Sequence, residues 1–330
     1  WRYADELRSY KRGWLTYVMH IALVFFIAGL TGNRFLTHIL CSGYYLFNII
    51  SFDMGIMEEV RFGFGLTPGI EDFSELNGYG IWTVSAFWYS LTWASFTVTL
   101  ILLGIHFWRR GSSLNFIRKL TFRTKQLNLS VKGVAALSMV ANFFLQSFIV
   151  KQVNDKGNFN TETQEKLEDA NYEKKYIWME AVSQPKLTRL DMQFNLYPED
   201  LKATYAAEMK LTNKASIAID TLYLHFEDFV TFDEIRWNNQ VLSASWIDQE
   251  YGQLAFPVLL DSASTGVLSI AGQKQYLGFT QSGDSPQPDI TFNGSFMSAK
   301  DILPGVGYDA DRELDKNRDR QDHELMKINS

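Results

Sequence analysis

The segment from residue 109 to residue 132 constrains this chain more than any other, because it is strongly basic and lies between two long apolar stretches. It contains no aspartate or glutamate. Its basic residues are Arg109, Arg110, Arg118, Lys119, Arg123, Lys125 and Lys132. Basic segments beside membrane-spanning stretches stay on the cytoplasmic side of a bilayer. We therefore predict that this segment is a cytoplasmic loop.

Four apolar stretches predict membrane helices, at residues 14–30, 35–52, 81–108 and 133–150. A helix needs about 20 apolar residues to cross a bilayer. The third stretch is long enough, and the other three are near the lower limit. The alternative interpretation is that these are core helices buried in a globular protein. Aromatic residues near the ends of the stretches, such as Trp14, Trp82 and Trp108, favour the membrane interpretation.

The charges of the loops predict which end of each membrane helix faces the cytoplasm. Residues 53–80 carry six acidic residues and one basic residue, Arg61, so we place them outside the cytoplasm. Residues 33–34 then form a tight cytoplasmic turn, with Arg34 and Trp108 as orientation anchors beside the basic loop. Residues 1–13 and 151–330 lie outside. The four basic residues in 1–13 oppose this order, and an interfacial amphipathic helix around Leu7, Tyr10 and Trp14 would accommodate them.

The net charge of −6 hides a difference between the two halves of the chain. Residues 1–150 have a net charge of +5 and residues 151–330 a net charge of −11. The acidic half argues against nucleic-acid binding, which requires a basic face. The single cysteine, Cys41, excludes a disulfide framework. The start at Trp1 and the charged end of the chain lead us to expect a piece of a longer polypeptide.

The second half predicts a polar helix followed by strands. Residues 161–182 are rich in Glu, Lys and Ala and read as a polar helix, which would form a stalk within 151–185 that Pro185 ends. Alternating apolar and polar residues predict strands at 187–197, 203–211, 217–226, 229–237, 240–247, 253–260, 265–271 and 276–281. The predicted fold is therefore an α-helical transmembrane segment of about four spans, followed by a mainly antiparallel β-sandwich.

Several short strings of residues resemble one protein family. They are residues 73–80 (FSELNGYG), 107–111 (FWRRG), 172–176 (YEKKY), 184–188 (QPKLT), 196–199 (LYPE), 211–214 (LTNK), 292–296 (FNGSF), 301–308 (DILPGVGY) and 311–314 (DREL). In this order and spacing they resemble bacterial membrane proteins that fuse an ABC-2-type permease to an M1-family (gluzincin) aminopeptidase-like domain.

The resemblance implies a layout for the chain. Residues 1–108 would be the last permease helices, and 109–150 the basic loop with an additional transmembrane helix. Residues 151–185 would form the stalk, 186–300 an extracytoplasmic β-sandwich like the N-terminal domain of M1 peptidases, and 301–330 the start of a connection to a catalytic domain. The resemblance also implies a bacterial inner membrane, a separate ABC ATPase subunit and a homodimer.

The chain lacks the zinc motif that M1 peptidases use. That motif, His-Glu-x-x-His, places two zinc ligands one helical turn apart. Only His323-Glu324 begins such a motif, and Leu325-Met326-Lys327 does not complete it. We expect no catalytic residue, cofactor or metal ligand in this chain, and zinc only in a downstream domain. For His20, His38 and His106, in or near apolar stretches, a structural role is favoured over a functional one.

Asn293 is the one candidate for a substrate-facing residue, because the resemblance implies that its segment grips the free amine of a peptide. A β-turn at Asn293-Gly294 is the competing interpretation. The leading functional hypothesis is the membrane-embedded part of a permease–peptidase fusion that couples the handling or cleavage of peptides outside the cytoplasm to transport. Two alternatives remain open. One is a non-enzymatic ABC transport component, and the other is a membrane-anchored binding or structural module whose sandwich recognises a ligand or partner.

Overall fold

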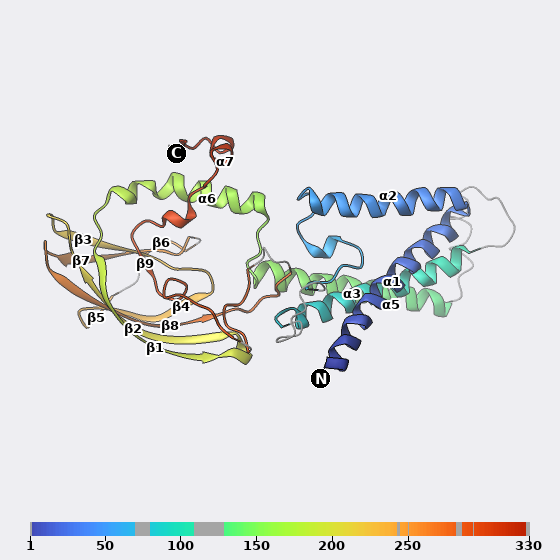
Figure 1. Ribbon diagram of the computed structural model, residues 1–330, viewed down its shortest axis with the longest axis horizontal. Coiled ribbons are helices and arrows are strands. Elements are labelled where there is room, and N and C mark those ends of the chain that lie inside the picture. Colours follow the sequence, from blue (N-terminus) through green and yellow to red (C-terminus); the bar gives the residue numbers. More distant parts are fainter. Residues whose placement is uncertain are drawn as a thin grey trace. The chain divides into compact units, whose positions relative to one another are not determined.

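The computed structural model describes residues 2–69, 80–108, 129–242, 245–249, 251–281, 286–292 and 294–327. The chain divides into two compact units. The first unit comprises Trp1–Phe159 and Gly278–Pro286, and the second comprises Asn160–Leu277 and Gln287–Ser330. Helices build the first unit, and strands dominate the second (Figure 1).

The described residues of the first unit contain four long helices. They are α1 (Arg2–Thr31), α2 (Arg34–Asp53), α3 (Trp82–Phe107) and α5 (Leu129–Val150), with a short 3-10 helix η1 (Val60–Phe62) and a π-helical turn η2 (Lys151–Asp155) after α5. Within the described residues, three helical stretches are long and apolar enough to cross a membrane: Arg34–Phe52, Trp82–Phe107 and Leu129–Asp155. The expected count of about four spans is therefore too high. The first stretch, Thr16–Thr31, is apolar but shorter than a span.

The helices of the first unit alternate in direction. Helix α1 runs alongside α3, because Gly29 lies against Gly104 and Phe25 stacks on Trp108 with ring centroids 5.1 Å apart. Helix α5 runs the opposite way, since its later residue Asn142 donates to the Thr92 carbonyl oxygen at 2.9 Å. The earlier residue Ser138 bonds Thr99 at 2.6 Å, further along α3. The turn at 32–33 and the ends of α3 and α5 that flank residues 109–128 thus share one end of the helix group. This agrees with the predicted order, and the membrane side of that end stays a prediction.

Residues 64–66, which follow η1, pack into the helix group. Phe64 is buried and contacts Trp93 and Phe96 of α3 edge-on, with ring centroids 5.2 and 5.9 Å apart. The indole nitrogen of Trp93 donates to the Leu66 carbonyl oxygen at 2.8 Å. Gly65, next to Phe64, has a φ of +77°, which glycine adopts without strain. An aromatic side chain from this segment thus packs in the core of the helix group.

Residues 276–281 were expected to form a strand, and this expectation is wrong. The last long strand instead extends to Gln275, and the chain then turns to the first unit. There the Phe279 amide donates to the Gln152 carbonyl oxygen at 3.0 Å, and its ring packs on Phe148. The Tyr89 hydroxyl donates to Gln281 at 3.3 Å. An apolar partner and hydrogen bonds to residues far away in the sequence replace the pairing that a strand would need.

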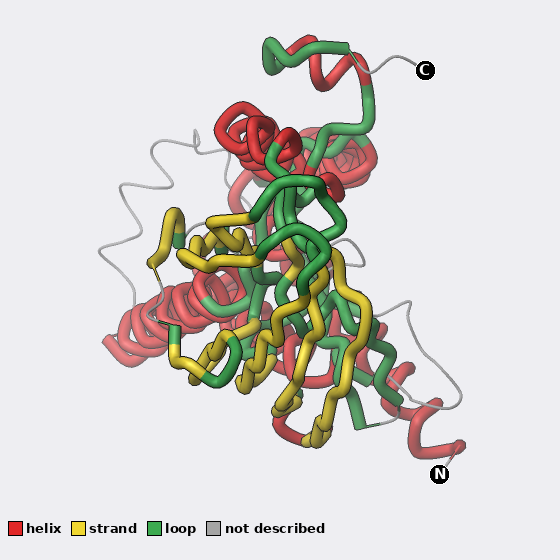
Figure 2. The backbone as a smooth tube through the Cα atoms, turned by 90° about the vertical axis from the view of Figure 1, so that its left-hand side faces the viewer, coloured by secondary structure: helices red, strands yellow, loops and turns green. Residues whose placement is uncertain are grey.

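The second unit contains two antiparallel sheets. The first has the order β1-β2-β8-β4-β5 and the second the order β6-β7-β3-β9. The strands are β1 (Lys186–Tyr197), β2 (Lys202–Thr212), β3 (Ile219–His225), β4 (Val230–Trp237), β5 (Gln240–Val241), β6 (Ser245–Asp248), β7 (Gln253–Leu260), β8 (Thr265–Gln275) and β9 (Gly305–Val306). The single strand expected at 240–247 is thus two short strands, which belong to different sheets. Figure 2 shows the strands in yellow.

Alternation along the strands creates the core between the sheets. In β2, Ala203, Tyr205, Ala207, Met209 and Leu211 are buried, and the residues between them are more exposed. They pack with Leu222 and Leu224 of β3 and with Leu254 and Phe256 of β7. Period-two burial on both sheets is the pattern of a sandwich with one dry face per sheet. The expected antiparallel, sandwich-like architecture agrees with this arrangement.

The polar helix expected as a stalk packs on the second unit. Helix α6 (Glu162–Tyr176) begins at a capping box made by Thr161 and Gln164, and the short helix η3 (Ile177–Ala181) follows it. Tyr172, Tyr176 and Met179 are fully buried. They lie against the outer face of the four-stranded sheet, where Trp178 meets Tyr223 of β3 edge-on at 5.7 Å. Most of the charged residues seen in the sequence form the solvent face of this helix, and Glu173 is the buried exception.

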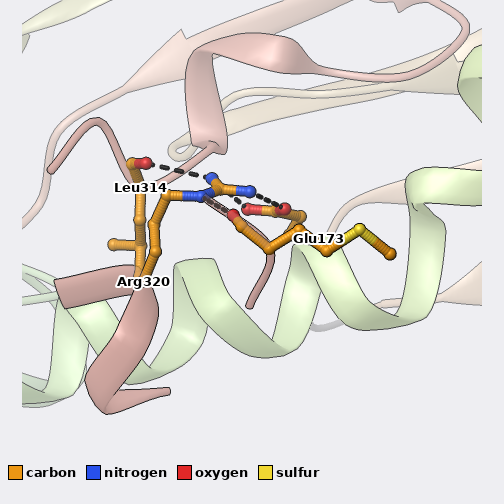
Figure 3. Close-up of polar contacts among 4 residues, drawn as sticks. Glu173, Leu314 and Arg320 are labelled. Atoms are coloured by element: carbon orange, nitrogen blue, oxygen red, sulfur yellow. Dashed lines mark hydrogen bonds and ion pairs between the residues drawn. The ribbon is translucent and has the colours of Figure 1, made fainter. Parts of the chain in front are cut away.

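The last described residues also belong to the second unit. After β9 come the short helices η5 (Ala310–Arg312) and α7 (Asn317–Asp322). Arg320 of α7 is buried and forms an ion pair with Glu173 of α6, with distances of 2.8 and 2.5 Å for its two terminal nitrogens (Figure 3). The segment expected to lead towards a catalytic domain is therefore fixed to α6.

Candidate functional site

The open face of the five-stranded sheet carries a groove. Helix α6 covers the outer face of the other sheet, and both inner faces are buried in the core. The groove has a volume of about 840 Å³, within the usual range for ligand sites. It is lined by Leu190, Asp191, Met192, Gln193, Ala206, Ala207, Glu208, Glu234, Arg236, Ser269, Ile270 and Ala271.

Strand register arranges the polar lining residues in rows across the sheet. Asp191 of β1 lies opposite Glu208 of β2, which lies opposite Ser269 of β8, and Ser269 lies opposite Arg236 of β4. Directly opposed residues in antiparallel strands share a face. All four side chains therefore belong to the solvent side.

The neighbouring row provides the floor of the groove. It contains Gln193, Ala206, Ala271 and Glu234, each opposite the next across β1, β2, β8 and β4. Alanines at the two middle positions leave the centre of the sheet without large side chains. The hollow is thus a consequence of small residues on β2 and β8 between polar residues on the outer strands.

Two of the three carboxylates in the groove have arginine partners. Asp191 accepts from Arg189 at 2.7 Å, and Glu234 accepts from Arg236 at 2.9 Å. Glu208, between them, makes no hydrogen bond or ion pair with the part of the chain that the structure describes. It interacts electrostatically with the Arg189 guanidinium and shares the exposed face with Lys210 and Arg236, so three cations balance the three carboxylates.

A second cluster of polar residues lies under α6. Its rings, which we name the tyrosine cluster, are Tyr172, Tyr176, Tyr251 and Tyr308. Tyr308 stacks on Tyr172 at 5.5 Å, and the Tyr172 hydroxyl accepts from the Asp309 amide at 3.0 Å. Burial raises the pKa of Tyr172 to about 12. This hydroxyl therefore stays protonated and holds the 308–309 segment in place.

Two cations lie over the tyrosine cluster. The Arg312 guanidinium is 5.3 Å from the ring centre of Tyr172 and 5.7 Å from that of Tyr251. The Lys175 ammonium lies over Tyr176 and Tyr251 and forms an ion pair with Asp248. Cation–π contacts of this kind stabilise by about 0.5–1 kcal/mol at exposed sites. The chain's own side chains occupy these ring faces, so we assign this cluster to the packing of η5 on α6.

Asp169, on the same helix, is the half-buried carboxylate of this region. Burial raises its pKa to about 6, the nearby carboxylates add to the effect, and Arg312 opposes it. Because the pKa of the folded protein lies above the ordinary value, the protonated form favours folding. This contribution is complete below about pH 4 and disappears as the pH rises through about 6.

Replacing Asp169 with asparagine is expected to stabilise the protein at pH 8 and to leave stability nearly unchanged at pH 4. The expected gain is on the order of 1 kcal/mol, since partial exposure screens the charge. Denaturant unfolding at the two pH values measures it. Glu180→Gln, at an exposed carboxylate of η3, is the control and should show no difference between the two pH values. Equal behaviour of the two variants would contradict this role of Asp169.

Most of the predicted site residues lie outside the part of the chain that the structure describes. Asn293, the candidate substrate-facing residue, lies outside the described residues. So do the orientation anchors Arg109, Arg110, Arg118, Lys119, Arg123 and Lys125. Arg34 begins α2 and is exposed, Trp108 follows α3 and stacks on Phe25, and Lys132 lies in the first turn of α5. Their roles as anchors stay predictions.

Three of the five histidines, His20, His225 and His106, have side-chain contacts in the described part of the chain. His20 bonds the Thr16 carbonyl oxygen through Nδ1 at 2.8 Å, and its ring lies edge-on to Phe64. His225 bonds the Gly307 carbonyl oxygen at 3.1 Å, and His106 contacts Phe107. His323 caps the end of α7. Among the described residues, no group of three or more His, Cys, Asp or Glu is arranged to hold a metal ion.

Sequence reasoning did not identify the groove. The alternation along residues 187–197 placed Asp191 and Gln193 on one face, which is a partial signal. Apart from Leu190 and Met192, the other lining residues lie between residues 206 and 271, in β2, β4 and β8, whose order across the sheet is not sequential. A groove of this kind requires knowledge of the strand order, which the alternation of one strand does not contain.

Comparison with known proteins gave only distant structural similarity. No protein-family model matches the chain, and the search of curated proteins gave no match. Among solved structures, the chain is similar to an M1 zinc metallopeptidase from Deinococcus radiodurans, with 12% identity and a TM-score of 0.24, over 28% of this chain and 20% of that one. A two-domain M1 zinc metallopeptidase mutant bound to L-arginine is 12% identical, with a TM-score of 0.25, over 36% and 30% of the two chains.

The aligned region thus spans less than a third of these metallopeptidases. The similarity is weak and covers a minor part of both chains.

Proposed function

We propose that this chain is a membrane-anchored binding module, in which the outer groove of the five-stranded sheet binds an extended peptide. The groove is the observation that carries the proposal. It combines a volume of about 840 Å³, a floor of small residues and a border of charged and amide side chains. Polar groups such as Gln193 and Ser269 offer hydrogen bonds to peptide amides, and the alanines leave room for the backbone.

Membrane anchoring is supported by three helical stretches of sufficient length and hydropathy. Large apolar side chains on their surfaces are exposed, among them Phe35, Ile39, Leu137 and Phe143. Such residues are costly in water and favourable in lipid. Flotation of the protein with lipid vesicles after a high-salt wash tests this part. Recovery of the protein in the aqueous fraction would contradict it.

Peptide binding is tested with a variant that fills the groove. Ala206 is exposed at the floor, so Ala206→Phe adds a ring without disturbing the core. We expect this variant to fold normally and to lose binding of short unstructured peptides in isothermal titration calorimetry. Ala218→Phe, at an exposed position outside the groove, is the matched control. If Ala206→Phe bound peptides as tightly as the unaltered protein, the groove would not be the peptide-binding site.

The sequence motifs support a more specific proposal. In the full-length protein the chain would serve as the permease-side and recognition part of an ABC-2-type permease fused to an M1-type zinc aminopeptidase, in a bacterial inner membrane. Zinc would lie in a downstream domain, an ABC ATPase would be a separate subunit, and the second unit would face away from the cytoplasm. Coupling of peptide handling to transport is part of this proposal.

The peptidase part is tested by hydrolysis of chromogenic amino-acid amides, with and without a zinc chelator. The full-length protein should be active and should lose its activity with the chelator, while this 330-residue chain should be inactive. Inactivity of both forms would favour the binding module without an enzyme. Co-purification of an ATPase would support transport, and its repeated absence would count against it.

A further inference from the structure

Two aromatic side chains of the second unit, Phe292 and Phe296, are exposed although they lie close together in the sequence. Phe296 has 92% of its surface exposed, the highest fraction among the large hydrophobic side chains in the described part of the chain, and Phe292 has 66%. We name them the phenylalanine pair. Exposed apolar residues that occur singly need no explanation, whereas grouped ones indicate a surface that contacts protein or membrane.

The exposure of the phenylalanine pair follows from how the residues around it are fixed. Ile290 is buried, with 2% exposed, and Met297 packs on the core between the two sheets. The Phe296 amide donates to the Asp289 carbonyl oxygen at 3.2 Å, which closes a reversal of the chain. Apolar side chains thus hold the base of this reversal in the protein. The two rings cannot both turn into the core unless these contacts break.

The segment that carries the phenylalanine pair has no charge of its own. Residues 290–297 contain no Asp, Glu, Lys or Arg. Asp289, directly before them, forms an ion pair with Lys274. Charged side chains are costly in lipid, so an uncharged segment with exposed rings suits an apolar surface.

The chain itself keeps the phenylalanine pair within reach of a bilayer. Gln281 accepts a hydrogen bond from Tyr89 of α3, and Phe279 packs on Phe148 of α5. Both helices are long and apolar enough to cross a membrane. About ten residues lead from Gln281 to the pair, and a chain of that length extends at most about 36 Å. The covalent connection therefore supplies a lipid surface at a high local concentration, whereas a second copy or a soluble partner would have to be recruited.

We propose that Phe292 and Phe296 insert into the lipid bilayer that the helices of the first unit cross. The rings hold their face of the second unit at the membrane surface, because insertion removes apolar ring surface from water. Aromatic and other large apolar side chains occupy the boundary between headgroups and acyl chains in this way. This inference rests on the proposed membrane anchoring, and it does not depend on peptide binding in the groove.

The experiment measures the depth of a nitroxide spin label at residue 296, with the whole chain reconstituted in vesicles of phosphatidylethanolamine and phosphatidylglycerol. Cys41 is the single cysteine, so Phe296→Cys is made together with Cys41→Ala. Oxygen concentrates among acyl chains and a nickel chelate stays in water, so the ratio of their collision rates with the label reports its depth. We expect the label at 296 to lose most of its collisions with nickel, relative to a label at Leu259→Cys, an exposed position of β7. A label at Phe292→Cys, which keeps the other ring, should behave like the label at 296.

A label at Leu137→Cys, an exposed position of α5, tests the anchoring on which the inference rests. Lipid exposure at 137 with water exposure at 292 and 296 would overturn the inference and retain the membrane anchor. Water exposure at all three positions would overturn both. Protection of 292 and 296 from both reagents would show that protein covers the pair, and it would also contradict lipid insertion. Lipid exposure at 259 to the same extent would mean that the pair is not a specific contact with the bilayer, and the inference would be wrong.

Discussion

Arg320→Ala is expected to lower the free energy of unfolding by about 3–5 kcal/mol, because it leaves the buried carboxylate of Glu173 without its partner. Both side chains are buried, with 4% of each residue exposed. The guanidinium uses all its edges: two nitrogens contact Glu173, and the carbonyl oxygens of Leu314 and Met326 accept at 3.0 and 2.6 Å (Figure 3). Lysine could not replace this planar set of donors.

Denaturant unfolding of the whole chain, followed by tryptophan fluorescence, measures the effect. Arg318→Ala is the matched control, since Arg318 is exposed on the same short helix. It should change stability by less than about 0.5 kcal/mol. The double variant Arg320→Met with Glu173→Leu should recover much of the loss, because apolar packing can replace a buried pair. A loss below about 1 kcal/mol for Arg320→Ala would show that the C-terminal segment is not fixed to α6 by this contact.

Gly29→Val is expected to separate α1 from α3 and to destabilise the helix group by about 1–3 kcal/mol, the usual cost of overpacking. A Cβ atom at Gly29 would lie 2.9 Å from the Gly104 carbonyl oxygen, which is backbone and cannot rotate away. Small residues at such crossings let helices approach closely in membranes, where apolar surface alone does not drive them together.

Thermal unfolding in one detergent compares this variant with Gly43→Val. A Cβ atom at Gly43, in α2, would meet nothing within 4 Å, so the control should melt like the unaltered protein. A lower midpoint for both variants to the same extent would indicate a general effect of valine and not a helix crossing. Unchanged midpoints would contradict the close contact between α1 and α3.

The sequence indicated the main elements well where local chemistry decides them. Helices α2, α3 and α5 lie within a few residues of the predicted apolar stretches, since continuous apolar runs have few alternatives. Strands β1, β2, β4 and β7 also agree closely, because alternation and turn residues define them. The prediction of a strand at 276–281 is wrong because the Phe279 ring packs on Phe148 in the first unit. The local sequence pattern contains no information about such a distant partner.

The burial of several side chains of α6 depends on tertiary contacts and could not be predicted from the local sequence. The charge pattern of residues 161–182 suggested a free polar helix, since the three buried side chains Tyr172, Tyr176 and Met179 are few among many charges. Glu173 reads as one more solvent-exposed acid until α7 places Arg320 against it. In both places, contacts with segments far away in the sequence bury side chains that the local sequence pattern predicts to be exposed.

The sequence by itself determined that the first half is apolar enough for a membrane, that the second half forms antiparallel strands, and which residues of each strand face the core. These properties follow from hydropathy and periodicity, which act over a few neighbouring residues. The tertiary structure alone decided the strand order and the covering of one sheet by α6. The groove around Glu208 follows from these two, because its rows are formed by strands far apart in the chain and its face is open only where no helix packs.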